Sequence, residues 1–502
     1  MALVTFVLGG SAQASAQRES AQSFDAYVAS AMKQWQVPGV AIVVVRGDSV
    51  IFAKGYGVRE AGKADPVDEH TIFAIGSATK AMTAAALGML VDEGKIHWDD
   101  PVSSLIRGFQ FAQPVLTAEV TVRDLLSHRT GLPGNNMVFW GTQYGRDDLV
   151  HRVRFIQPTN GIRTKFEYQN IMYLMAGQII PAVTGKSWDD FLRDRLLVPL
   201  GMTSTSTSIV ALKGEVNVAT PHTAGAGGAQ PIPWWNADNV GPAGSVNSNA
   251  LDMARWVAVQ LNDGVYHGSR VFSAAVAREM HTPQMLIEPQ SLLGRLFPEA
   301  HILTYGMGWF IYDYRGHKVL EHGGDTDGMS SNVALLPDQH VGVVILTNLG
   351  GALIRNALTY RAFDRYLDVS PRDWSTDELA VLEGMREGAD LERRAAPAPR
   401  IANTTPSLPL EQYVGTYHDD LYGDAVVTLE NGSVVMRFLG ATGHATHWHY
   451  DTFQFDFGTT RTQLRGKPLV TFALDQRARV MGLRIAGASL TRAPKAAAPG
   501  SP

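Results

Sequence analysis

The chain changes its pattern at residues 394–409 (RAAPAPRIANTTPSLP), and this change constrains the fold more than any other feature. The stretch is rich in Ala and Pro and lacks helical or strand periodicity, which is typical of a linker. Helical and strand-like runs are mixed before it, whereas short alternating runs follow it. We therefore predict folded domains at 19–393 and 410–493, joined by this linker and followed by a disordered tail at 494–502.

The first domain combines strand patterns from distant parts of the sequence. Residues 40–58 (VAIVVVRGDSVIFAKGYGV) predict two strands joined by a Gly-Asp turn, and strand-like runs return at 305–322 and 331–348. Helical spacing marks residues 22–36 and much of the chain from about 77 to 290. We expect one α/β unit in which these strands share a sheet that packs against helices on both faces.

The second domain shows strand patterns only. Short alternating runs fill residues 412–492, and the turn Glu430-Asn431-Gly432 between two apolar runs is a strong hairpin signal. Many short strands separated by turns are typical of closed antiparallel architectures. We expect a small all-β barrel.

Composition excludes several classes of function. The 502 residues include no Cys, which excludes thiol nucleophiles and cysteine-based zinc or iron–sulfur sites. The formal net charge is −5 and no long basic run occurs, so we expect no nucleic-acid partner. No apolar run beyond the N-terminus approaches the ~18 residues that cross a bilayer, so we expect no integral membrane association.

The first residues resemble the end of a secretory signal. The apolar start of segment 1–18 leads into Ala12-Gln13-Ala14, which has the A-x-A form of a cleavage site, although no basic residue precedes it. An apolar N-terminus without a targeting role is the alternative. We predict a periplasmic or secreted protein with a residual signal-like segment.

Ser77 and Lys80 form the first candidate for chemistry. They begin the Ala-rich helical run at 78–93, where a serine hydroxyl lies near unpaired backbone N–H groups. Lys80 is one turn away on the same face, and a lysine with a lowered pKa can take the proton of a hydroxyl nucleophile. The alternative is a serine that caps the helix and a solvated lysine.

Tyr168 and Asn170 form the second candidate, just ahead of a helical run at 171–184. A phenol or phenolate here could carry a proton between the serine and a leaving group, and the amide of Asn170 could orient a lysine or a substrate N–H. In the alternative, Asn170 is an ordinary helix N-cap and Tyr168 a half-buried aromatic residue.

His322-Gly323-Gly324-Asp325 forms the third candidate, between two strand-like runs. The two glycines allow the backbone to approach a ligand closely, and an edge strand could bind an extended substrate through main-chain hydrogen bonds. The alternative is a Gly-rich hairpin with an incidental histidine.

Three histidines, His444, His447 and His449, lie close together in the second domain. No cysteine or carboxylate pair completes a ligand set, so we predict barrel packing, no metal and no cofactor.

The order Ser-x-x-Lys, Tyr-x-Asn and His-x-Gly resembles the serine β-lactamase and penicillin-binding-protein superfamily, in its class C or esterase-like branch. Segments TVRDLLSHRTGLP (121–133) and PAGSVNSNALDMARW (242–256) are similar to connecting segments of that family. The resemblance covers about 25–365 and implies a β-lactamase-like sheet flanked by helices. Residues 411–419 and 447–455 resemble the lipocalin-like barrel appended to some members.

The resemblance implies a role for each motif residue. Ser77 would be the acylated nucleophile, Lys80 its base and Tyr168 the second proton-transfer group. The backbone N–H groups of Ser77 and Asp325 would form the oxyanion hole, where one donor is typically worth ~100–1,000-fold in rate.

Asn170, His322 and Gly324 would position the substrate. True β-lactamases and transpeptidases usually carry a lysine where this chain has His322, and a histidine with a reference pKa near ~6.5 is often neutral. The weaker attraction for anions argues against β-lactams and for neutral esters, amides or peptide bonds.

The resemblance therefore implies a serine hydrolase that works through an acyl-enzyme on a small peptide or ester. Amide cleavage in short or D-residue-containing peptides is the first expectation, with linearised microcystin a candidate substrate. An esterase for short acyl esters is one alternative. The other is a catalytically silent binder of peptidoglycan stem peptides, which would need none of Ser77, Lys80 and Tyr168.

Overall fold

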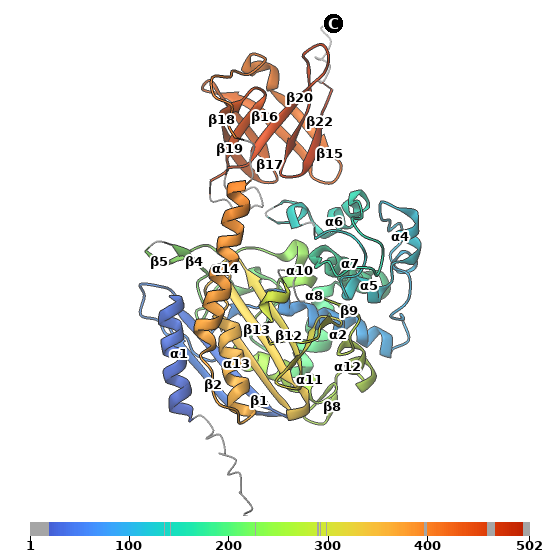
Figure 1. The fold of residues 1–502 in the computed structure, drawn as a ribbon. Helices are drawn as coiled ribbons and strands as arrows, with labels where there is room; N and C mark the ends of the chain where they lie inside the picture. Colours follow the sequence, from blue (N-terminus) through green and yellow to red (C-terminus); the bar gives the residue numbers. More distant parts are fainter. Residues whose placement is uncertain are drawn as a thin grey trace, which may run out of the picture.

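The computed structural model describes residues 20–494 apart from positions 135, 141, 226, 289–290, 292, 298, 396–398 and 459–466. The predicted signal-like segment and all but the first residue of the predicted tail lie outside the described residues. Figure 1 shows an α/β part built around a sheet and a β-barrel above it, with α14 (Trp374–Ala395) rising from the first part toward the second.

An eight-stranded sheet forms the centre of the α/β part. Its strands, in spatial order, are β2 (Ser49–Gly57), β1 (Gly39–Arg46), β14 (Val341–Thr347), β13 (Met329–Leu336), β12 (His317–Thr326), β11 (Phe310–Tyr314), β10 (Leu303–Tyr305) and β9 (Met285–Leu286). Strand β1 pairs antiparallel with β14, which confirms that strands from distant parts of the sequence share one sheet.

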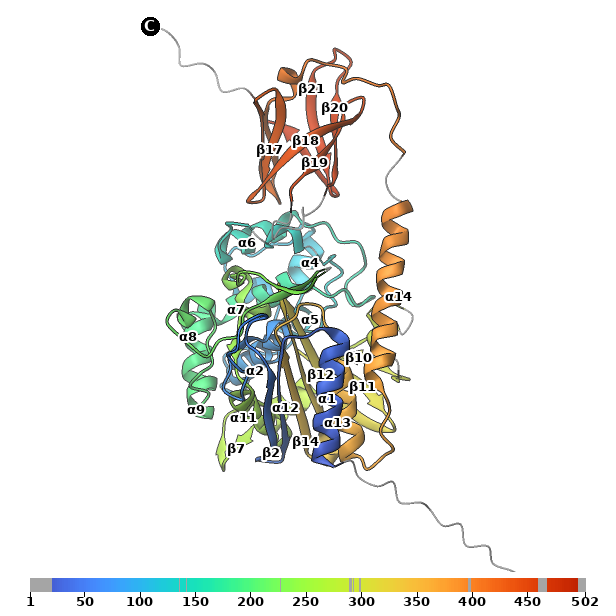
Figure 2. The ribbon, with the colours of Figure 1, turned by 90° about the vertical axis from the view of Figure 1, so that its left-hand side faces the viewer.

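Helices cover both faces of this sheet because its central strands are apolar on both faces. Along β1, Val40, Ile42 and Val44 belong to one apolar cluster. Their alternate neighbours Ala41 and Val43 belong to the other. The first face packs on α1 (Ala21–Trp35), α13 (Ile354–Tyr366) and α14, and the second on α2 (Thr79–Asp92), α7 (Asn170–Thr184), α11 (Ala250–Leu261) and α12 (Ala274–Met280), as Figure 2 shows from the side.

The strand-like run at 305–322 is not one strand. It divides into the end of β10, then β11, then most of β12. Arg315 and Gly316 reverse the chain between β11 and β12 with positive φ angles of 49° and 82°.

Shorter elements complete the α/β part. They are α3 (Val102–Leu105), α4 (Pro114–Glu119), α5 (Val122–Leu126), α6 (Arg146–Arg152), α8 (Trp188–Leu192), α9 (Val198–Leu200), α10 (Gly241–Gly244), and the two-stranded pairs β3 (Phe73–Ala74) with β6 (Asn247–Ser248), β4 (His222–Gly225) with β5 (Gly228–Pro231), and β7 (Val265–Tyr266) with β8 (Ser269–Arg270). Among the described residues, no helix combines the length and the apolar composition that crossing a bilayer requires.

The C-terminal part is a closed barrel of eight strands in sequence order, which confirms the expected all-β architecture. The strands are β15 (Gly415–Asp419), β16 (Gly423–Glu430), β17 (Ser433–Phe438), β18 (Ala441–His449), β19 (Thr452–Asp456), β20 (Leu469–Leu474), β21 (Val480–Ile485) and β22 (Ala488–Arg492). Glu430 pairs with Ser433 across Asn431 and Gly432, as the hairpin signal predicts.

The barrel contacts the α/β part through the turn between β15 and β16. The Tyr144 hydroxyl donates a hydrogen bond to the Tyr422 carbonyl at 2.8 Å, and Arg152 donates to the Leu421 carbonyl at 2.7 Å. Gly423 lies so close that a Cβ there would stand 2.1 Å from the Tyr144 hydroxyl oxygen. The side chain of Leu421 completes the contact by entering the apolar cluster of the α/β part.

Candidate active site

Ser77 lies in a 3₁₀ turn, η1 (Gly76–Ala78), immediately before α2. The N-cap of α2 is Ala78, without a side-chain capping bond, so the alternative that Ser77 caps this helix is wrong. Its hydroxyl oxygen instead lies 2.9 Å from the Lys80 amine.

Lys80 is fully buried, so the alternative of a solvated lysine is also wrong. Its Nζ lies 2.7 Å from Asn170 Oδ1 and 2.8 Å from the Ala243 carbonyl oxygen, as well as 2.9 Å from Ser77 Oγ. Burial holds the pKa of Lys80 well below its ordinary 10.5, because the charged form loses its hydration. The amine therefore loses its proton far more readily than an exposed lysine does.

Tyr168 and Asn170 reach the same point from the start of α7. The N-cap of α7 is Gln169, so Asn170 is not an N-cap, and its amide oxygen accepts a bond from Lys80. The Tyr168 ring lies beside Lys80, with its centroid 4.8 Å from Lys80 Nζ. Burial raises the pKa of Tyr168 above its ordinary 10, so the phenol keeps its proton at neutral pH.

Strand β12 packs so closely against η1 and the residue before it that only glycine fits at the contact. A Cβ on Gly324 would stand 1.8 Å from the Ile75 carbonyl oxygen, and a Cβ on Gly76 would stand 2.8 Å from the Asp325 nitrogen. The Ser331 hydroxyl also donates to the Ile75 carbonyl at 2.7 Å. The backbone of Ile75 and Gly76, just before Ser77, is thus packed against the backbone of Gly324 and Asp325. The sequence predicts an oxyanion hole at this place.

The end of β12 near Ser77 is paired on one side only. Pairing with β11 stops at Glu321, whereas pairing with β13 continues to Thr326. Among the described strands, none pairs with the other edge of residues 322–326. This is the edge on which an extended substrate can form main-chain hydrogen bonds.

His322 is buried, and both ring nitrogens have partners within the protein. Nδ1 donates to the Gly323 carbonyl at 2.7 Å, because a carbonyl can only accept, and Nε2 therefore accepts from the Tyr305 hydroxyl at 2.9 Å. Burial lowers the pKa of His322 to about 3. The imidazole is neutral, and its substrate-positioning role stays a prediction.

Several contributors carry no signal in the sequence. The Ala243 carbonyl holds Lys80, but a main-chain acceptor has no residue type to reveal it. Arg355, from α13, pairs with both carboxylate oxygens of Asp325 at 2.8 and 2.9 Å. This ion pair holds β12 in place at Asp325, whose backbone nitrogen is a predicted oxyanion donor. Its partners are 30 residues apart, so no local sequence pattern predicts that they meet.

His128 packs against the aromatic side chains beside the site. Its Nδ1 accepts from the Gln169 backbone N–H at 3.0 Å, and its ring lies 4.4 Å from the Tyr168 ring. Elsewhere, His447 interacts with the Tyr450 carbonyl at 3.0 Å. Within the described ranges, no three His, Asp or Glu side chains gather closely enough to hold a metal ion.

Comparison with known proteins identifies the class. Residues 24–365 match the family model described as Beta-lactamase, and residues 399–496 match a domain of unknown function, DUF3471. The chain belongs to the β-lactamase family, and this membership makes it a serine hydrolase.

Its relatives include a protein named as a hydrolase and a penicillin-binding protein. The unguisins hydrolase ungD of Aspergillus violaceofuscus is 31% identical over 81% of this chain and 76% of its own length. Penicillin-binding protein 4 of Amycolatopsis lactamdurans is 34% identical over 63% of this chain and 82% of its own. The octameric penicillin-binding protein homologue of Pyrococcus abyssi shares the fold with a TM-score of 0.64, at 20% identity, over 94% of this chain and 100% of that one.

Proposed function

We propose that this chain is a serine peptidase that hydrolyses amide bonds in short linear peptides, D-residue-containing ones among them, through an acyl-enzyme at Ser77. Linearised microcystin is one candidate substrate. The observation that carries the proposal is the buried Lys80 amine at 2.9 Å from the Ser77 hydroxyl oxygen.

The partners of Lys80 support its role as the base. Asn170 Oδ1 and the Ala243 carbonyl can only accept hydrogen bonds, so they take the two N–H groups of a neutral amine. The lone pair is then left for the Ser77 hydroxyl, which is the arrangement that a general base requires. A silent binder would have no use for a buried lysine without a counter-ion, because burial of its charge is costly.

The reaction runs in two halves. Lys80 takes the Ser77 proton as Oγ bonds to the carbonyl carbon, and the resulting oxyanion faces the backbone N–H groups of Ser77 and Asp325. The C–N bond breaks as the departing nitrogen receives a proton from Tyr168, which recovers one from Lys80. Water then attacks the acyl ester and gives up a proton to the same groups, Ser77 regains its hydrogen, and the new carboxylic acid leaves.

The electrostatics of the site support neutral peptide bonds over β-lactams. His322 is neutral, and Arg355 is already paired with Asp325, so neither offers a free positive charge for a substrate carboxylate. The relative named as an unguisins hydrolase also favours this choice. The signal-like start of the sequence supports a periplasmic or secreted location, where short peptides are available.

Mass spectrometry of a defined pool of linear L- and D-residue peptides tests the proposal. We expect cleavage by the wild type and by Ser269→Ala, an exposed serine in β8 that serves as the matched control, and none by Ser77→Ala. A mass increase on intact protein, mapped to Ser77, would identify the acyl-enzyme. Turnover of short esters without any peptide cleavage would indicate an esterase, and no Ser77-dependent turnover of either would refute a catalytic role for this serine.

A further inference from the structure

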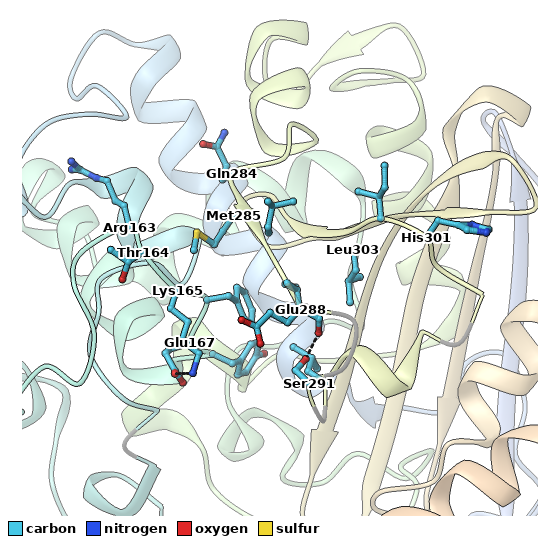
Figure 3. Close-up of a pocket in the computed structure, with 16 residues that line it drawn as sticks. Arg163, Thr164, Lys165, Glu167, Gln284, Met285, Glu288, Ser291, His301 and Leu303 are labelled. Atoms are coloured by element: carbon cyan, nitrogen blue, oxygen red, sulfur yellow. Dashed lines mark hydrogen bonds and ion pairs between the residues drawn. The ribbon is translucent and has the colours of Figure 1, made fainter.

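A cavity of about 960 Å³ opens beside Tyr168. Figure 3 shows its two walls, with β9 and the residues that follow it on one side and the segment from Arg163 to Glu167 on the other. The start of β10 closes the far end at Leu303. Its volume is at the upper end of the ~300–1,000 Å³ that is usual for ligand pockets, which is more than a small acyl group would fill.

Apolar side chains form about half of the cavity lining. These include Phe166, Met285, Ile287, Leu293 and Leu303. Such a lining binds uncharged, apolar groups, because each one displaces water from apolar surface on both partners.

The basic side chains at the cavity are already paired, whereas one acidic side chain is not. Arg163 binds Asp124, outside the cavity, at 2.7 Å, and Lys165 binds Glu167 at 3.1 Å, while Glu288 forms no ion pair among the described residues. An anionic ligand group would meet these paired cations and the Glu288 carboxylate, so the charge distribution disfavours an anion.

The mouth of the cavity carries apolar residues that the fold does not cover. Leu286 on β9 is 72% exposed and Ile302 is 64% exposed. Strand β9 is the terminal strand of the sheet, and its outer edge faces no other strand of the described sheet. Exposed apolar residues on a free strand edge are a liability that proteins usually avoid, and they fit an element that an extended peptide covers.

Tyr168 connects the cavity to the reacting atoms, since it lines the cavity and its ring centroid lies 4.8 Å from Lys80 Nζ, which lies 2.9 Å from Ser77 Oγ. Gly324 and Asp325 lie against Ile75 and Gly76, just before Ser77. In the proposed reaction, Tyr168 gives its proton to the departing amine, so the part of the substrate that leaves with the amine lies on the Tyr168 side.

We propose that this cavity binds the leaving-group side of a linear peptide and takes a large apolar side chain within the first residues after the scissile bond. The proposal rests on the proposed function, because it uses the acyl-transfer role of Ser77 and Tyr168. The preferred substrates are then peptides in which a residue such as Phe or Leu follows the cleaved bond.

The test compares peptides that differ only at the position after the bond located by mass spectrometry. We expect kcat/KM to be about 10- to 100-fold higher with Phe than with Ala there, and lowest with Glu. Leu286→Asp should reduce the preference for Phe about tenfold. Val210→Asp, at a site of similar exposure (67%) that does not line the cavity, should leave the preference unchanged.

A short chromogenic ester separates this proposal from the proposed function. Its acyl group and small leaving group do not fill the cavity. Val210→Asp and Ser269→Ala should turn the ester over at the wild-type rate, and Ser77→Ala should not. Equal kcat/KM for Phe, Ala and Glu peptides, or equal effects of Leu286→Asp and Val210→Asp, would overturn the cavity proposal while ester turnover still depends on Ser77. Ester turnover that survives in Ser77→Ala would overturn the proposed function and this proposal with it.

Discussion

Adding a single methyl group at Gly324 should disable the site without unfolding the protein. The Cβ of Gly324→Ala would stand 1.8 Å from the Ile75 carbonyl oxygen and 2.6 Å from Ser331 Oγ. Since such contacts are essentially never shorter than 3.0 Å, β12 and η1 would have to separate by about 1.2 Å, the difference between 3.0 and 1.8 Å. The backbone around Ser77 and Asp325 would separate with them.

The size of the effect follows from that displacement. A misplacement of ~1 Å typically costs ~100-fold in rate, and loss of one oxyanion donor costs ~100–1,000-fold. We therefore expect kcat/KM of Gly324→Ala to fall at least ~100-fold, which corresponds to ~2.7 kcal/mol of transition-state stabilisation. The assay is turnover of a chromogenic ester, with circular dichroism and a thermal melt to show that the fold is kept.

The neighbouring glycine provides the control. The three atoms nearest to a Cβ on Gly323 would be Arg355 Nε at 3.3 Å, Arg355 Nη2 at 3.5 Å and Asn332 Oδ1 at 3.6 Å, all in side chains rather than backbone. Gly323→Ala should thus retain most of the activity. If Gly324→Ala keeps more than a third of wild-type kcat/KM, or if the two variants lose activity equally, the close contact between η1 and β12 does not set the geometry of the site.

Three further predictions concern charge and domain structure. Lys80→Ala should be nearly inactive, and wild-type kcat/KM should be lost as pH falls through an apparent pKa well below 10.5, because only the neutral amine accepts the Ser77 proton; a flat pH–rate profile would contradict this. The pKa of His322 is about 3 in the folded protein and lies below its ordinary 6.5. Below about pH 6.5 the unfolded chain therefore binds a proton at this histidine that the folded protein does not bind. The free energy of unfolding falls by up to ~1.4 kcal/mol for each pH unit in this range. Urea melts between pH 4.5 and 7 should show a shallower slope for His322→Gln and an unchanged slope for the exposed His70→Gln. A fragment that ends at residue 400 should fold and turn over the ester, because the barrel has its own apolar core; insolubility would show that the surface under Leu421 needs the barrel.

Local spacing explains why much of the site could be predicted from the sequence. Ser77 and Lys80 meet because three residues make about one helical turn, and the structure places Tyr168 and Asn170 beside them from the start of a second helix. The sheet could also be predicted from the sequence, since the apolar run of β1 requires helices on both faces. The Ser77–Lys80 pair and the sheet rest on contacts within one element or on a period that the sequence displays. The meeting of Asn170 with Lys80, 90 positions away, rests on the family resemblance instead.

The remaining features depend on contacts between distant segments. The bond from Lys80 to the Ala243 carbonyl joins residues 163 positions apart through a main-chain atom. The tautomer of His322 depends on Tyr305, which side-chain patterning marks only as an aromatic strand residue. The cavity requires β9 to lie opposite the segment before α7, and no local pattern fixes that distance. Tertiary packing alone decides such features.

The contact between barrel and α/β part has a consequence for how the two can diverge. Tyr144 and Arg152 donate their hydrogen bonds to main-chain carbonyls of the β15–β16 turn, so these bonds persist when the side chains of the turn are exchanged. Two positions of the turn are tied to their residue type: any side chain at Gly423 would collide with Tyr144, and Leu421 enters the apolar cluster of the α/β part. The hydrogen bonds thus recognise the path of the turn rather than its sequence, and a different barrel that kept this path, its glycine and an apolar residue at 421 could be exchanged for the present one.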